Sequence, residues 1–263
     1  MRTMNVALLA GAVLASSPGQ AATVFSDSGA TAADIQATVD SFRAALGELN
    51  PFLPESFAGG RREINWDGVP DAISDPNLFP GATFNGASPG TARGLVSIPT
   101  GLSTGLAVSA SLASGVPIEF GEAEDYTPFS PEKLFEPVGG STLDNVLFDP
   151  SDQVTEATTT GFGVVFTGLP SALAPTMTFY GRGGGVLAEE SVAITEVAGL
   201  AFLGVLFDNP LVARVAIDVG DEAVMDDFLY GEPAPIPLPA GLPLLAAGLA
   251  ALAGVRRLRA RTS

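Results

Sequence analysis

The sequence predicts a mainly β protein: an antiparallel, jelly-roll-like sandwich with one N-terminal helix, followed by a C-terminal transmembrane helix. Three observations support this prediction. From residue 81 onward, short runs of β-branched and aromatic residues are separated by Gly, Pro, Asp and Asn, which is typical of antiparallel strands joined by turns. One amphipathic run precedes them, and an apolar run without charges lies near the end of the chain. The 263 residues are enough to bury a sizeable core.

Residues 1–21 are predicted to be a secretory signal peptide. Arg2 precedes an apolar run over Val6–Leu14, which is too short to span a membrane. Ser, Pro and Gly residues then break the run ahead of the small residues Ala21 and Ala22. We expect the secretion machinery and a signal peptidase as partners, with cleavage after Ala21 or after Ala22.

A single helix is predicted over Ala32–Leu46. Thr31 and Asp34 have the spacing of a capping box, and Gly47 supplies a stop signal. Apolar residues recur at helical spacing along this run: Ile35, Val39, Phe42, Leu46 and Leu49. One face of the helix should therefore pack against the rest of the domain.

The segment Asn65–Pro89 is predicted to be a long ordered loop over the sandwich, because its Pro, Asp and Gly residues leave little periodicity. Gly181–Gly185 is expected to form a hairpin turn between two strands; no Gly-Lys-Ser/Thr follows, as a phosphate loop would require. The predicted strands are Gly94–Ile98, Leu106–Leu112, Gly163–Thr167, Thr176–Tyr180, Ser191–Thr195, Leu200–Phe207, Leu211–Val219 and Val224–Tyr230.

Composition restricts the function. The 29 acidic residues all lie between Asp27 and Glu232, where only seven of the 12 basic residues are found, so this part carries a net charge of about −22. Such a field repels phosphate backbones, and no nucleic acid is expected as a partner. The chain has no histidine and no cysteine, which excludes Ser-His-Asp and Cys-His nucleophiles, zinc hydrolases and disulfides. Cations or neutral polymers are the more plausible partners.

Residues 234–263 are predicted to be a membrane tail. Pro233–Pro239 is Pro-rich and is expected to be an extended spacer, and Gly241–Val255 is apolar and uncharged. Four arginines follow and are expected to stop the segment on the cytoplasmic side: Arg256, Arg257, Arg259 and Arg261. We therefore expect a signal peptide over 1–21, an acidic β-sandwich ectodomain over 22–233, and a Pro-rich linker, transmembrane segment and Arg-rich stop over 234–263.

Part of this tail resembles a known sorting signal. Pro237, Leu238, Pro239 and Ala240, followed by the apolar run and the arginines, resemble the VPLPA type of the PEP-CTERM signal, with Ile236 where valine is usual. The resemblance implies processing by an exosortase-like membrane enzyme in a Gram-negative bacterium that makes exopolysaccharide. It places the protein at the cell envelope or the extracellular surface, at least transiently in the inner membrane, and implies no activity.

The ectodomain is also similar to a group of exported PEP-CTERM proteins. The similarity lies in an early block, Gly60–Asp71, and a late block, Val224–Pro233. It implies a sandwich fold and export, and it supplies no catalytic residue.

Two groups of aspartates are candidate calcium ligands. Asp67, Asp71 and Asp75 lie on the long loop, and Asp226 and Asp227 lie on the last predicted strand. Calcium is bound by six to eight oxygen ligands, which a loop dense in carboxylates can supply. The loop spacing is not that of an EF-hand, and a solvated acidic loop is the alternative.

Asp226 and Asp227 need a separate argument. Strand alternation would send the two side chains to opposite faces, so one of them must point inward or lie at a strand end. An inward carboxylate needs a partner, either an arginine or a metal. Arg61 or Arg62 is the predicted partner, which would join the early block to the late strand.

Trp66 is the candidate glycan-binding residue, because sugars stack on exposed amphipathic aromatic rings. The other such residues are Tyr126, Tyr180 and Tyr230, whereas the 16 phenylalanines are expected in the core. The alternative is that Trp66 packs under its loop. A glycosidase needs only two suitably spaced carboxylates, a condition that 29 acidic residues always meet, so no enzyme is predicted.

The sequence therefore predicts an exported, envelope-anchored surface or extracellular-matrix protein without evident catalysis. The alternative is a calcium-dependent module that binds exopolysaccharide.

Overall fold

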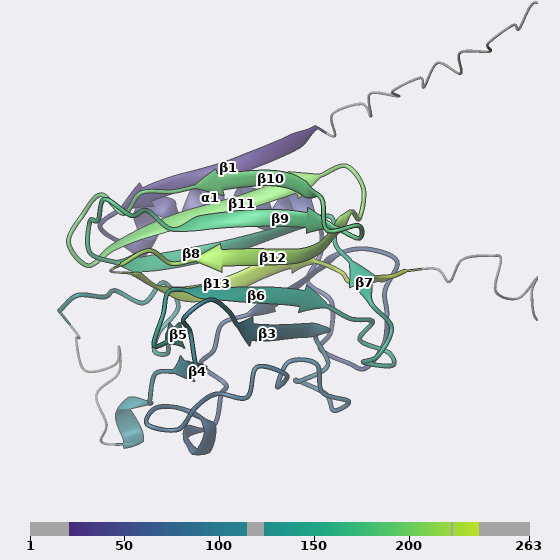
Figure 1. Ribbon diagram of the computed structural model, residues 1–263, viewed down its shortest axis with the longest axis horizontal. Coiled ribbons are helices and arrows are strands. Elements are labelled where there is room, and N and C mark those ends of the chain that lie inside the picture. The colour runs from purple at the N-terminus through teal and green to yellow at the C-terminus, as the bar shows by residue number, and fades with distance from the viewer. Residues whose placement is uncertain (1–20, 115–123, 222, 237–263) are drawn as a thin grey trace, which may run out of the picture.

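The computed structural model describes residues 21–114, 124–221 and 223–236. The predicted signal peptide, apart from Ala21, and the predicted sorting signal, transmembrane segment and arginine stop lie outside these residues. The described chain forms a β-sandwich of two antiparallel sheets with one α-helix, as Figure 1 shows. None of the described helices is long and apolar enough to cross a membrane.

Seven strands form the larger sheet. Its order is β1 (Ala22–Gly29), β11 (Gly199–Phe207), β8 (Gly161–Gly168), β13 (Ala223–Gly231), β5 (Phe135–Val138) and β4 (Gly105–Val108), and β2 (Arg61–Ile64) also pairs with β13. Every residue of β8 and β13 is buried, because the sandwich core covers one face of these strands and a helix and loops cover the other.

Five strands form the second sheet, which faces the viewer in Figure 1. Its order is β10 (Val186–Ser191), β9 (Thr176–Gly181), β12 (Val212–Asp218), β6 (Thr142–Leu147) and β3 (Leu95–Pro99). A two-stranded ribbon, β14 (Ala234–Pro235) with β7 (Ala157–Thr158), lies where the described chain ends, and two short 3-10 helices cover Asp71–Ile73 and Leu112–Ser114. Burial alternates along β9 and β6, so one face of this sheet packs on the core and the other faces outward.

The helix α1 (Ala32–Leu46) has the predicted bounds and the predicted capping box, so this prediction is confirmed. Its buried face packs on the larger sheet, behind the sandwich in Figure 1. The Phe42 ring lies over Gly163 and Gly204: a Cβ added at these positions would come within 2.7 and 3.0 Å of ring atoms. Only glycine lets the ring approach the sheet so closely.

Seven of the eight predicted strands overlap strands of the structure by three or more residues, and the eighth shares a single residue with a strand. The prediction of Ser191–Thr195 is wrong, because the strand there is β10, which ends at Ser191. The Gly181–Gly185 hairpin turn is confirmed by the hydrogen bond from the Gly181 N–H to the Gly185 carbonyl at 2.9 Å. The strands that were not predicted from the sequence are β1, β2, β5, β6, β10 and the two-residue strands β7 and β14.

The predicted spacer begins too early. Pro233 is buried, Ala234 and Pro235 pair with β7, and the Ile236 N–H donates to the Glu156 carbonyl at 2.9 Å. Residues 233–236 therefore belong to the folded domain.

A buried ion pair joins β2 to the end of β13. The Arg62 guanidinium donates from Nε and Nη2 to the two Glu232 carboxylate oxygens at 2.6 and 2.7 Å. It also donates to backbone carbonyls, among them those of Ala92 at 2.6 Å and Glu55 at 2.8 Å. Arg62 is fully buried, and it satisfies polar groups of three chain segments that otherwise share little regular structure.

Replacing Arg62 alone should destabilise the protein strongly. Arg62→Met leaves the Glu232 carboxylate buried without its cation, which costs about 3–5 kcal/mol of unfolding free energy. Urea unfolding of the full chain in detergent measures this loss. The double variant Arg62→Met/Glu232→Gln removes the unpaired charge and should recover part of it; a single-variant loss below about 1 kcal/mol, the size of an exposed pair, would contradict the assignment.

Candidate functional site

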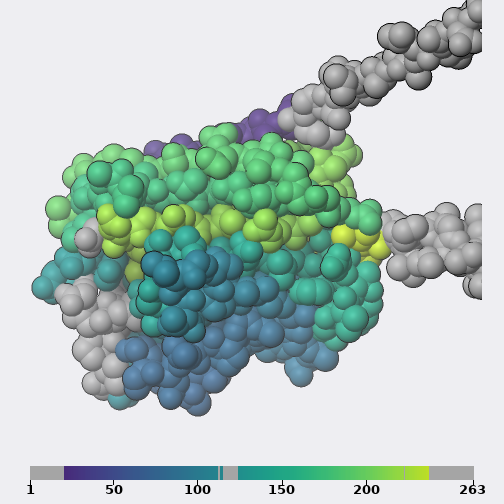
Figure 2. Space-filling model, viewed as in Figure 1, coloured from purple at the N-terminus to yellow at the C-terminus, as the bar shows by residue number. Residues whose placement is uncertain are grey.

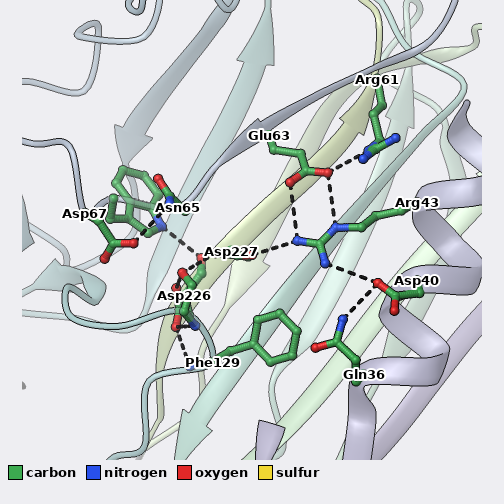
Figure 3. Close-up of polar contacts among 12 residues, drawn as sticks. Gln36, Asp40, Arg43, Arg61, Glu63, Asn65, Asp67, Phe129, Asp226 and Asp227 are labelled. Atoms are coloured by element: carbon green, nitrogen blue, oxygen red, sulfur yellow. Dashed lines mark hydrogen bonds and ion pairs between the residues drawn. The ribbon is translucent and has the colours of Figure 1, made fainter. Parts of the chain in front are cut away.

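Asp226 and Asp227 lie at an irregularity of β13 (Figure 3). Met225 is opposite Phe166 and Phe228 is opposite Val164, so β13 advances three residues while β8 advances two. This is a β-bulge, and it replaces the simple alternation expected from the sequence. Both aspartates are buried, with exposed fractions of 0% and 3%.

Backbone and hydroxyl donors hold this pair of carboxylates. Asp226 accepts hydrogen bonds from the N–H groups of Phe129 and Ser130 at 2.6 and 3.1 Å. The Ser130 hydroxyl donates to Asp227 at 2.8 Å. The indole N–H of Trp66 donates to the Asp226 carbonyl at 2.8 Å, so the early block does contact the late strand here.

The arginine partner differs from the predicted one. Arg43 of α1 donates to Asp227 at 3.0 Å and to both carboxylate oxygens of Glu63 at 3.1 and 3.3 Å. Arg61 pairs with Glu63 instead, and Arg62 pairs with Glu232, so neither contacts Asp226 or Asp227 as predicted. Arg43 was missed because it lies on a helix 184 residues away from its partner in sequence.

Burial shifts the protonation of this pair. It raises the pKa of Asp226 well above the usual range, and the neighbouring Asp227 charge raises it further. Burial also raises the pKa of Asp227, although Ser130 and Arg43 partly oppose the shift. Burial therefore favours the protonated forms of both carboxyl groups, and the arrangement is a buried structural network.

The loop aspartates surround a lysine instead of forming one ligand set. Lys133, which is 2% exposed, donates from Nζ to Asp71 at 2.9 Å, and its backbone N–H donates to Asp67 at 3.0 Å. Asp75 lies elsewhere, near Glu136: burial of Glu136, with a further contribution from the Asp75 charge, raises the pKa of Glu136 to about 7. Among the residues that the structure describes, no three acidic side chains form a group that could hold a metal ion. The five predicted calcium ligands are thus not brought together.

Trp66 is 1% exposed, so the prediction that it stacks on sugars is wrong. Its ring stacks on Phe135 at 4.0 Å between centroids and packs edge-on against Phe79, Phe84 and Phe228. Tyr230 is also buried. Of the tyrosines, Tyr180 lies on the outward face of the five-stranded sheet.

That outward face presents a polar row at its centre. Tyr180 of β9 and Arg214 of β12 are directly opposite, and the guanidinium carbon lies 3.7 Å from the ring centroid. Arg214 also donates from Nη1 to both oxygens of Asp144 on β6, at 2.8 and 2.9 Å. Thr178 and Asp218 continue the outward face along β9 and β12. Three neighbouring strands thus supply one half-buried aromatic and charged cluster.

A cleft of about 250 Å³ lies at one end of this face. It is bordered by Tyr180 and Arg214, by Arg182 and Gly184 of the hairpin turn, and by Glu156 and Ile236 of the ribbon end. The sequence identified Tyr180 as an amphipathic aromatic residue, and Arg214 was missed. Their pairing depends on strand register, which the sequence does not reveal.

Comparisons with known proteins add little. No family model and no curated protein matches the chain. The enzymatically active domain of tailspike protein 4 of bacteriophage CBA120 is similar over 54% of this chain and 19% of that chain, with 13% identity and a TM-score of 0.23. A CBM4 structure is similar over 58% of this chain and 97% of that chain, with 10% identity and a TM-score of 0.21. Likeness this weak carries no argument about function.

The buried carboxylates should make the protein more stable in mild acid. The pKa is raised in the native state for three carboxyl groups: Asp226, Asp227 and Glu136. Above the ordinary carboxyl pKa, the native state therefore binds protons that the unfolded chain has released. The unfolding free energy therefore falls as pH rises from 5 to 8. We expect a loss of at least about 1 kcal/mol of unfolding free energy over this range. In a domain of this size, that loss lowers the melting temperature by roughly 2–4 °C.

Asp226→Asn should flatten this dependence, because an amide oxygen accepts the same N–H donors without a charge. The exposed Asp208→Asn, directly after β11, serves as the control and should keep the wild-type slope. A wild-type melting temperature that rises from pH 5 to pH 8 would refute the assignment.

Calcium should leave thermal stability unchanged. Asp67 and Asp71 are already bonded to Lys133, and Asp226 and Asp227 are buried. A native-state ligand at a hundred times its dissociation constant would add about 2.7 kcal/mol. Melting curves of the full chain in excess calcium and in EDTA should therefore coincide, and a calcium-dependent rise would restore the predicted site.

Proposed function

We propose that this is an exported, envelope-anchored surface protein that binds polysaccharide without catalysis, along the outward face of the five-stranded sheet. The jelly-roll-like connectivity, the exosortase-processed tail and the transmembrane segment expected from the sequence are part of this proposal. One observation carries the binding role: this face exposes Tyr180, Arg214 and Asp144 together, whereas α1 covers much of the opposite sheet.

The face is accessible. No described helix or strand lies in front of it in Figure 1, and Figure 2 shows β9, β10 and β12 at the surface of the molecule. A strand of six residues spans about 20 Å, and five strands side by side span a similar width. This area suits several sugar units of an extended chain.

The chemistry of the face suits sugars. A sugar ring has apolar C–H faces and a rim of hydroxyl groups, so it needs an aromatic or planar surface beside hydrogen-bond donors and acceptors. Tyr180 and the Arg214 plane supply the surface, and Asp144 and the Thr178 hydroxyl supply the hydrogen bonds. The proposal does not require calcium.

We propose no catalysis because a substrate has no access to the paired carboxylates of β13. The adjacent carboxylates of Asp226 and Asp227 are buried and bonded to protein donors, so a glycosidic bond cannot reach them. The chain has no histidine or cysteine, so Ser-His-Asp and Cys-His hydrolase sites are excluded.

Tyr180→Ala should weaken polysaccharide binding. Loss of the buried ring area removes about 1.5–3 kcal/mol, which corresponds to roughly tenfold or more in affinity. Affinity electrophoresis of the full chain in detergent against exopolysaccharide from the producing cells measures the effect.

Leu49→Ala is the control, since Leu49 is 45% exposed, lies beyond the end of α1 and is absent from this face. If the wild type, Tyr180→Ala and Leu49→Ala were retained equally by the polysaccharide in the gel, binding at this face would be contradicted. Release of reducing sugar by the wild type would contradict the absence of catalysis.

A further inference from the structure

The basic side chains of the described residues are almost all committed to protein partners. Arg43, Arg61, Arg62, Lys133 and Arg214 each form an ion pair. Arg93 is held between Phe52 and Phe84 and donates to backbone carbonyls. Arg182 is exposed on the hairpin turn and borders the cleft. In the described part of the chain, no acidic side chain pairs with it.

Arg214 borders the same cleft and keeps unused donors. Its two hydrogen bonds to Asp144 both start from Nη1, and its plane stacks on the Tyr180 ring. Nε and Nη2 have no acceptor among the described residues. These two nitrogens form one edge of the guanidinium, with the spacing that matches the two oxygens of a carboxylate.

We infer that this cleft binds a carboxylate-bearing sugar, with the Nε and Nη2 edge of Arg214 and the side chain of Arg182 as its donors. The inference rests on the proposed function and narrows its ligand class to glycans that contain uronic acid. Tyr180 holds the Arg214 plane in place, and Asp144 orients it from the opposite edge. Arginine suits this role because its planar donors recognise carboxylates in pairs.

The surrounding charge restricts the ligand further. The segment between the two ends of the chain carries a net charge of about −22. Asp218 and Glu189 lie exposed on strands of the same sheet, and the exposed Glu156 borders the cleft itself. A polymer with a carboxylate on every sugar would meet repulsion along the face. The favoured ligand therefore has one carboxylate at the cleft and neutral sugars along the remaining strands.

Two oligosaccharides test this inference directly. One is a neutral glucose hexasaccharide, and the other is the same chain with a terminal glucuronate. Isothermal titration of the full chain in detergent should give at least tenfold tighter binding of the glucuronate form. Polyglucuronate should bind less tightly per site than the singly charged chain.

Variants assign the gain to the two arginines. Arg214→Lys keeps the charge but loses the paired donors, and Arg182→Gln loses the second cation; each should reduce binding of the glucuronate form towards that of the neutral chain. Tyr180→Ala should weaken both ligands. Thermal unfolding of each variant shows that the loss is not due to misfolding.

The possible outcomes separate the two proposals. Equal affinity for the two hexasaccharides, reduced by Tyr180→Ala, would overturn the carboxylate inference and leave polysaccharide binding intact. Binding of neither ligand would overturn both. Competition by millimolar inorganic phosphate as effective as that by the glucuronate chain would make the cleft a general anion site and would also overturn the inference.

Discussion

The buried pair of Arg62 and Glu232 is the interaction on which much of the architecture depends. The chain between α1 and β3 contains one regular strand, β2, and its backbone carbonyls need donors that a sheet cannot provide. Arg62 gives hydrogen bonds to carbonyls on both sides of β2, while Glu232 accepts from the Asn50 amide at 2.9 Å and the Phe57 N–H at 3.2 Å. The two side chains thereby fix long irregular segments to the end of β13. Without them, the segments that cover Trp66 would lose their attachment to the sandwich.

Local patterns predicted those parts of the fold that local physics determines. The helix over Ala32–Leu46 follows from its cap and its apolar spacing, and the strongest strands follow from apolar runs. The strands β1 and β10 escaped because each lies at a sheet edge and carries polar residues on several positions. The strand β2 reads Arg-Arg-Glu-Ile, and ion pairs stabilise it together with the burial of Ile64. These strands form because of tertiary contacts, and such contacts cannot be inferred from a single sequence.

The candidate site was predicted less well for a related reason. Spacing suggested that nearby aspartates act together, but the structure separates them according to the cations and N–H groups that each one meets: Lys133 for the loop pair, and Phe129, Ser130 and Arg43 for the strand pair. Both strand carboxylates are buried because β13 is covered on both faces, and a β-bulge lies between Met225 and Phe228. Tyr180 was identified as an amphipathic aromatic, yet its contact with Arg214 follows from the register of β9 against β12. The residue types in the sequence suggested metal binding and sugar stacking. Which side chains actually meet depends on how the strands pair, and the sequence does not show this.

The short ribbon at the end of the described chain has a mechanical consequence. Any tension transmitted along the chain from residue 237 onward enters the domain at Ile236 and first meets two residue pairs of β14 with β7. Such a ribbon peels open one pair at a time and yields at low force. The next element, β13, is paired along its length with β8 and β2, so a pull along its axis must shear many hydrogen bonds at once. Under tension, the ribbon would lengthen the connection by a few residues while the sandwich itself stayed intact.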